Sequence, residues 1–221
     1  AEMLAARPSS QEDLPRLLNI FEQVCQTLSY THSCGVIHLD IKPANIMVGA
    51  FGEVHLMDWG LARASTDLCV PSVCGQFNVA GDHKQHHSLN ETPSSSRSIA
   101  SHDLEVHVPE GAVWGTPAYM SPEQATGHVS DVRSDVFGLG GMLCEILTGK
   151  PPYQGADFRD VCMKATRADL SETLAELADS GADPVLVRLA IKCLSADPDA
   201  RPADARIVAS ELTLYLESLL Q

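Results

Sequence analysis

Basic residues and long apolar runs are scarce in this sequence. Its 221 residues include 15 Lys and Arg against 29 Asp and Glu, which gives a formal net charge of −14. Clustered Lys and Arg are what hold nucleic-acid phosphates and anionic membranes, so we expect neither a nucleic-acid partner nor membrane contact from this segment. The longest apolar stretch, Val136 to Leu147, is interrupted by Glu145 and is too short to cross a bilayer.

Paired cysteines and an initiating methionine are lacking as well. The seven Cys are an odd number, are scattered along the chain and form no C-x-x-C pair. A secreted disulfide framework usually has an even, dense set, so the pattern favours a reducing, cytoplasmic location. The chain begins at Ala1, with no charged-then-apolar leader after it. We therefore expect a processed piece or a fragment of a longer protein.

The apolar pattern predicts a mainly helical globular domain. With 44% hydrophobic and 20% charged residues the composition is that of a globular protein, and the length fits about one domain. Apolar side chains spaced by three and four residues predict helices over about 14–34, 134–148, 157–167, 184–194 and 203–219. Short apolar runs at 36–37 and 46–48, followed by alternation at 53–57, predict a small β-hairpin that turns at 49–52.

Residues 65–110 have a different character. Ser and Thr are frequent there, five His occur, and apolar periodicity is lost, so we expect a long, disordered loop insertion. Two features of this stretch allow more than one interpretation. The serines Ser94, Ser95, Ser96 and Ser98 are either phosphorylation sites or plain disorder. A solvated loop is preferred to a metal site for Asp82, His83, His86 and His87, because no second ligand cluster accompanies them.

The most informative residues lie between positions 38 and 60. Residues 38–45 read His-Leu-Asp-Ile-Lys-Pro-Ala-Asn, and Asp58 follows the last of them by thirteen positions. Asp40, Lys42 and Asn45 place an acid, a base and an amide on a tight loop, and Asp58 adds a second acid after the hairpin. Mg²⁺ takes oxygen ligands from one or two side chains plus phosphate, a carboxylate can accept a proton from an alcohol, and Lys neutralises phosphoryl charge. The pattern therefore indicates Mg²⁺-dependent phosphate chemistry.

This pattern resembles the protein-kinase catalytic loop H-R-D-L-x-x-x-N and the D-F-G metal motif. Downstream, residues 115–123 (Gly-Thr-Pro-Ala-Tyr-Met-Ser-Pro-Glu) resemble the end of a kinase activation segment, and residues 134–140 resemble the buried helix that follows it. Residues 149–153 and 197–202 are similar to motifs that come later in the large lobe of kinases. Six motifs in family order are far more specific than any one alone. The sequence thus resembles the large lobe of a bacterial eukaryotic-like serine/threonine kinase.

The resemblance implies a kinase-like C-lobe, mainly α within an α+β family, with one small hairpin. A kinase also needs a Gly-rich loop and a strand lysine that anchor ATP. No G-x-G-x-x-G precedes Asp40, and Lys42 is the first lysine of the chain. We therefore expect residues 1–221 to be a partial kinase domain without the small-lobe sheet, with 65–110 inserted in the activation segment. The isolated chain should have very low activity, because positioning of ATP is most of what a kinase contributes.

The resemblance further implies ATP and Mg²⁺ as cofactors and a protein Ser or Thr hydroxyl as the substrate. Asp40 would orient that hydroxyl and accept its proton, Lys42 would steady the γ-phosphate, and Asn45 and Asp58 would hold Mg²⁺. Thr116 would bond Asp40 and Lys42 and face the substrate. The remaining implied roles are structural: packing by His38, Gly60 of the metal motif, the pair Glu123 with Arg201, and support of the catalytic-loop backbone by Asp135.

Two residues depart from the family pattern. Leu39 stands where the family has an Arg that pairs with a phosphorylated activation loop, and leucine cannot make that pair. Trp59 stands for the Phe of D-F-G and should fill the same space. A kinase is favoured, because Asp40, Lys42, Asn45 and Asp58 are all present. The alternative is a pseudokinase or truncated scaffold that binds partners without phosphoryl transfer.

Overall fold

The computed structural model describes residues 2–3, 13–65 and 115–220. The helices are α1 (Leu14–Ser33), α2 (Pro122–Ala125), α3 (Val132–Thr148), α4 (Phe158–Arg167), α5 (Ser171–Asp179), α6 (Pro184–Cys193) and α7 (Ala205–Ser218). The strands are β1 (Glu2–Met3), β2 (Val36–Ile37), β3 (Ile46–Val48), β4 (Val54–Leu56) and β5 (Arg63–Ala64). Short 3₁₀ turns lie at η2 (Pro43–Asn45), η3 (Trp59–Leu61), η4 (Pro117–Tyr119) and η5 (Pro198–Ala200). The predicted mainly helical class is confirmed.

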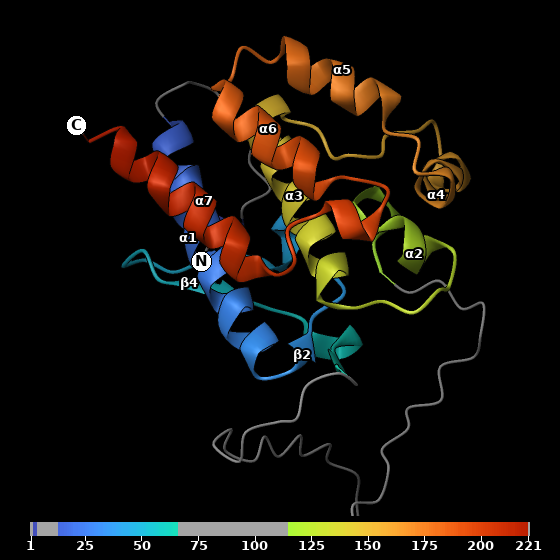
Figure 1. Cartoon of the computed structure of the whole chain (residues 1–221), viewed down its shortest axis with the longest axis horizontal. Coiled ribbons are helices and arrows are strands. Elements are labelled where there is room, and N and C mark those ends of the chain that lie inside the picture. The colour runs from blue at the N-terminus through green and yellow to red at the C-terminus, as the bar shows by residue number, and fades with distance from the viewer. Residues whose placement is uncertain (1, 4–12, 66–114, 221) are drawn as a thin grey trace, which may run out of the picture.

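Helix α3 forms the centre of the core. It is apolar on nearly every side, and 12 of its 17 residues are buried, as expected for a helix surrounded by other elements. It packs against α1, α6 and α7, which surround it in Figure 1 on its upper and left sides. Its glycines allow close approach: a Cβ at Gly138 would lie 2.7 Å from Cβ of Ile41, and one at Gly140 would lie 2.7 Å from Cβ of Cys193. The loop at Ile41 is therefore seated directly on this helix.

Helices α1 and α7 lie side by side although they are the first and the last helix of the described residues (Figure 1). The buried face of α1 includes Phe21, Val24 and Leu28, each 0% exposed, and it meets the face of α7 that contains Val208 and Leu212. This three- and four-residue spacing of α1 made its helix predictable from the sequence. The packing fixes the end of α1 from which the chain continues into β2 and the loop that contains Asp40.

Small antiparallel sheets hold the segment that follows α1. Strands β3 and β4 form the predicted hairpin, in which Ile46 pairs with Leu56 and Val48 with Val54. Gly52, with φ of 87°, occupies the turn, where an L side chain would be strained. Strand β1 adds to the other edge of β3, and β2 pairs with β5. The pairing of β2 with β5 closes residues 38–62 into one compact unit.

The sequence did not predict α2, α5, β1 and β5, which are all short. Helix α5 spans nine residues and buries only Thr173 and Leu177, so it offers few apolar positions from which a helical period can be recognised. Residues 66–110 lie outside the described residues, and so do the serine and histidine groups named above, so those predictions stay untested. In the part of the chain that the structure describes, no helix is both long enough and apolar enough to span a membrane.

Candidate active site

Asp40 lies on the loop between β2 and β3, and three donors orient its carboxylate. Oδ2 accepts hydrogen bonds from Lys42 Nζ at 2.6 Å and from Asn45 Nδ2 at 3.0 Å, and Oδ1 accepts one from the Thr116 backbone N–H at 3.2 Å. Asn45 Nδ2 also donates to the backbone carbonyl of Asp40 at 2.7 Å. The Asp40 side chain is 9% exposed. We call His38, Asp40, Lys42, Asn45 and Thr116 the Asp40 network.

Lys42 joins two segments that are far apart in the sequence. Its ammonium group donates to Asp40 Oδ2 and, at 2.5 Å, to Thr116 Oγ1, which lies 74 residues away. An ammonium group has three N–H donors. Within the described residues the structure shows these two acceptors, so one donor remains for a further acceptor such as a phosphate oxygen.

Asp135 of α3 supports the loop from beneath. Its carboxylate, whose side chain is 0% exposed, accepts from the backbone N–H of His38 at 2.8 Å and of Leu39 at 2.7 Å. His32 Nε2 bonds the same carboxylate at 2.9 Å, while His32 Nδ1 accepts from the Ala205 N–H at 3.3 Å. This pattern assigns the proton of neutral His32 to Nε2. A buried carboxylate with three donors thus fixes the backbone that precedes Asp40.

His38 is buried, and its neutral ring links two backbone segments of the site. Its Nδ1 accepts from the Asp40 N–H at 3.2 Å, and its Nε2 bonds the Met57 carbonyl at 3.0 Å, so Nε2 carries the proton. Burial lowers the pKa of His38 below its ordinary value of 6.5, an effect that the carboxylate of Asp135 only partly opposes. The Trp59 ring packs against it with centroids 4.5 Å apart. Trp59 is also 37% exposed, so it covers His38 with one part of its ring only.

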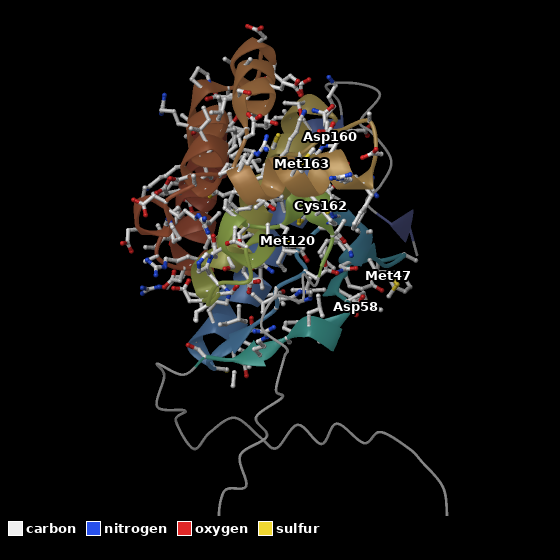
Figure 2. The ribbon with its side chains drawn as sticks, turned by 90° about the vertical axis from the view of Figure 1, so that its right-hand side faces the viewer. Met47, Asp58, Met120, Asp160, Cys162 and Met163 are labelled. Carbon is white, nitrogen blue, oxygen red and sulfur yellow. The ribbon has the colours of Figure 1, made fainter. Side chains whose placement is uncertain are left out.

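The β3–β4 hairpin brings Asn45 and Asp58 to the same end of two paired strands. Asn45 directly precedes β3, and its carbonyl accepts from the Met57 N–H at 2.8 Å, next to Asp58. Figure 2 shows Asp58 on the same side of the molecule as Met47 of β3. Asp58 has φ of 59° and is exposed. Asn45 Nδ2 donates to Asp40, so the amide oxygen is the atom of this side chain that could bind a cation, and the Met57–Asn45 backbone contact brings Asn45 and Asp58 to neighbouring positions along the paired strands.

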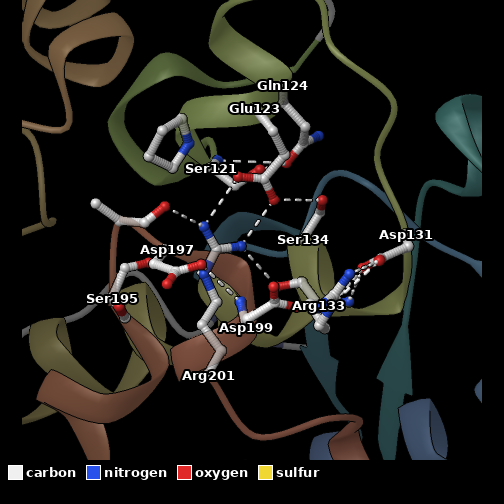
Figure 3. A network of polar contacts seen from close by, with 12 residues as sticks. Ser121, Glu123, Gln124, Asp131, Arg133, Ser134, Ser195, Asp197, Asp199 and Arg201 are labelled. Atoms are coloured by element: carbon white, nitrogen blue, oxygen red, sulfur yellow. Dashed lines mark hydrogen bonds and ion pairs between the residues drawn. The ribbon is translucent and has the colours of Figure 1, made fainter.

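A second cluster, the Arg201 network, fixes the segment after Thr116 (Figure 3). The Arg201 guanidinium forms a bidentate ion pair with Glu123, at 2.7 and 2.9 Å. Its other N–H groups donate to the carbonyls of Arg133, Ser195 and Ala196. Burial raises the pKa of Glu123, but the hydrogen bonds and charge of Arg201 outweigh this, so the pKa lies below its ordinary 4.5.

Sequence reasoning missed three polar residues that support the two networks or the loop that carries Asp40. Ser134 donates to Glu123 Oε1 at 2.7 Å, His32 bonds Asp135, and Gln124 donates from Nε2 to the Leu39 carbonyl at 2.9 Å. Ser134 and His32 are buried polar residues in otherwise apolar helical patterns, a signal that could have marked them as partners of another polar group. Gln124 is three residues after Ser121, a capping-box spacing that accounts for its two contacts with Ser121 but not for the third, with the Leu39 carbonyl.

Comparison with known proteins agrees with the residue pattern. The family model described as "Protein kinase domain" matches residues 3–78 and 100–213. The gap between the two matched parts lies inside the stretch for which we predicted an insertion. Asp40, Asn45, Asp58 and Asp135 all fall within the matched residues.

Curated relatives are bacterial kinases. The serine/threonine-protein kinase PknB of Mycolicibacterium smegmatis is 34% identical over 197 residues, which are 89% of this chain and 26% of that protein. PknB of Mycobacterium tuberculosis is 33% identical with the same coverage. PknD of Protochlamydia amoebophila is 28% identical over 201 residues, which are 91% of this chain and 18% of that protein. The chain therefore spans about a quarter or less of the length of these relatives.

Proposed function

This chain belongs to the protein kinase domain family, and from that premise we propose that the protein containing it transfers the γ-phosphate of ATP to Ser or Thr hydroxyls of proteins. One observation carries the proposal: a single network joins Asp40, Lys42, Asn45 and Thr116 across 76 residues of sequence. Phosphoryl transfer depends on positioning and electrostatic stabilisation. This network positions the Asp40 carboxylate, which can accept a proton, beside the Lys42 ammonium group.

Asp40 is the proposed proton acceptor. Its carboxylate is held by Lys42, Asn45 and the Thr116 N–H, so it is oriented before a substrate arrives. A substrate hydroxyl that donates to a free lone pair of this carboxylate is aligned for attack on the γ-phosphorus. It loses its proton to Asp40 as the new P–O bond forms, while the bond from the γ-phosphorus to the β,γ-bridging oxygen breaks and ADP leaves. The remaining donor of Lys42 would stabilise the phosphoryl oxygens.

The residues present fit Mg²⁺ with ATP. Asn45 and Asp58 offer an amide oxygen and a carboxylate, which are hard oxygen ligands, and Mg²⁺ completes its shell from phosphate and water. Among the described residues no three His, Cys, Asp or Glu gather as a metal site. Bound Mg²⁺ would supply charge neutralisation at the phosphates.

The preference for Ser and Thr rests on Lys42 and Thr116. Lysine two residues after Asp40 is the serine/threonine kinase pattern, and here it is locked to Thr116 Oγ1. Thr116 begins the segment that leads into η4 and α2, so the same contact ties the proton acceptor to the segment proposed to face the substrate. The names of the relatives agree with this preference.

The test uses the full-length protein, Mg-ATP labelled at the γ-phosphate and a Ser/Thr protein substrate. We expect Asp40→Asn to lower phosphate incorporation by about 10²- to 10⁴-fold, the usual contribution of a positioned base. Asp131→Asn is the matched control: Asp131 caps α3 at the surface, asparagine caps equally well, and incorporation should not change. Equal labelling in wild type and Asp40→Asn contradicts the proposal. Absence of labelling in the wild type would favour the partner-binding scaffold.

A further inference from the structure

Gln124 connects the catalytic loop to the segment proposed to bind substrate, and it does so through both ends of its amide. Oε1 accepts from the Ser121 hydroxyl at 2.9 Å and from the Ser121 N–H at 3.3 Å. Nε2 donates to the Leu39 carbonyl at 2.9 Å, across 85 residues of sequence. Because both Ser121 groups are donors here and Leu39 offers an acceptor, the amide has one satisfactory orientation.

The Leu39 carbonyl belongs to the peptide unit that ends at the Asp40 nitrogen. This peptide is held on both edges, by Gln124 on its carbonyl and by His38 Nδ1 on the Asp40 N–H. The peptide bond is planar, so fixing both edges fixes the position of the Asp40 Cα, from which its side chain leaves the loop.

The backbone at Leu39 needs such support. Leu39 has φ of 68°, in the left-handed region, where an L side chain crowds the backbone and the conformation is strained. Asp135 holds its N–H at 2.7 Å, and Gln124 holds its carbonyl. Strained backbone of this kind persists where the surroundings over-determine it. Gln124 and Asp40 also line the same small cavity between the loop and residues 115–124.

We propose that Gln124 is a positioning residue that sets the direction of the Asp40 carboxylate by holding the Leu39–Asp40 peptide. Its catalytic part rests on the proposed kinase function; its structural part does not. The contact also couples the two segments, since a movement of α2 that displaces Gln124 releases the loop that carries Asp40. The role requires the amide N–H, so glutamine is needed here although glutamate would cap α2 equally well.

Substitutions can separate the cap from the peptide contact. Gln124→Glu keeps the acceptor for Ser121 but, ionised at pH 8, cannot donate to the Leu39 carbonyl. Gln124→Met loses both contacts. Thr126→Ala is the control at the end of α2, because in the part of the chain that the structure describes the Thr126 hydroxyl contacts the carbonyls of Pro122 and Glu123 and the ring of His128. Thr173→Val, which removes a buried hydroxyl contact to Pro152 outside the site, is the control for a general loss of stability.

Two measurements on the full-length protein decide the proposal. In hydrogen exchange, Gln124→Glu and Gln124→Met should speed exchange in residues 38–45 by about three- to tenfold, while both controls leave it unchanged. In the kinase assay, Gln124→Glu should lower kcat by about 10- to 100-fold with KM for ATP within about twofold, since misplaced reacting groups reduce kcat. Thr173→Val should lower the melting temperature without changing kcat.

The outcomes separate this proposal from the proposed function. Unchanged exchange in residues 38–45 for both Gln124 variants overturns the positioning role, whether or not the wild type transfers phosphate. An active wild type with a loosened loop and an unchanged kcat overturns the catalytic part alone. An inactive wild type overturns the proposed function, and faster exchange in the variants would then still support Gln124 as the residue that positions this loop.

Discussion

The Asp40 network and the Arg201 network both place a buried acid against a base, but they use their donors differently. All five N–H groups of Arg201 have acceptors: two on Glu123 and three on backbone carbonyls. Lys42, in contrast, uses two of its three donors among the described residues. A saturated cation can only hold structure, whereas an unsaturated one beside an oriented carboxylate can still bind a ligand. The comparison separates a structural ion pair from a candidate catalytic one without reference to sequence motifs.

The strongest test of this distinction is the loss of Arg201. Arg201→Met leaves the Glu123 carboxylate, 13% exposed, without its cation, so we expect the free energy of unfolding to fall by about 3–5 kcal/mol. Arg133→Met is the matched control, because the Arg133 side chain pairs with Asp131 and Asp199 near the surface and should contribute about 0–1 kcal/mol. Urea unfolding measures both. Similar losses in the two variants would break the proposed division of roles.

The ease of predicting each network follows from the distances along the chain. The Asp40 loop was predictable because Asp40, Lys42 and Asn45 lie within six residues. Side chains that close in the sequence stay close to one another in the folded protein. The contact between Gln124 and Leu39 spans 85 residues and depends on the direction of one amide, which no local pattern records. Ser134 likewise occupies a position that helical periodicity assigns only to the core.

The two networks should also lose stability in different pH ranges. Because the folded-state pKa of His38 is lowered, mainly by burial, its contribution is present above the unfolded pKa of about 6.5 and is lost as pH falls toward the folded value. The pKa of Glu123 is lowered too: burial opposes the shift, but Arg201 outweighs it. Its contribution is present above about 4.5 and is lost as pH falls through the folded pKa.

Urea unfolding at pH 7.5, 5.5 and 4 measures both effects. The wild type should lose stability between pH 7.5 and 5.5, and His38→Gln should lose less over that interval because the titrating ring is gone. In Arg201→Met the free energy of unfolding should fall between pH 7.5 and 5.5 as it does in the wild type. Between pH 5.5 and 4 it should fall by less than in the wild type. If His38→Gln retains the full wild-type decrease above pH 5.5, the neutral, buried role of His38 is wrong.

The smallest expected effect concerns the hydroxyl of Tyr153, which adjoins the Arg201 network. Its ring stacks on Phe137 at 6.0 Å, and Arg201 lies 5.0 Å from the centre of the Phe137 ring. Of the buried side-chain nitrogen and oxygen atoms in the described residues, the Tyr153 hydroxyl alone has no hydrogen-bond partner. Leaving a buried donor unsatisfied costs free energy, so Tyr153→Phe should leave the free energy of unfolding unchanged or raise it by up to about 1 kcal/mol.

Thr173→Val gives the opposite case for this test. The Thr173 hydroxyl is also buried but donates to the Pro152 carbonyl, next to Tyr153, so its removal should lower the free energy of unfolding by about 1 kcal/mol. The two substitutions remove the same chemical group from adjacent sites, and only hydrogen bonding distinguishes them. If Tyr153→Phe loses as much stability as Thr173→Val, the Tyr153 hydroxyl must have a hydrogen-bond partner, such as a buried water. The polar contacts around Arg201 would then extend beyond its five acceptors.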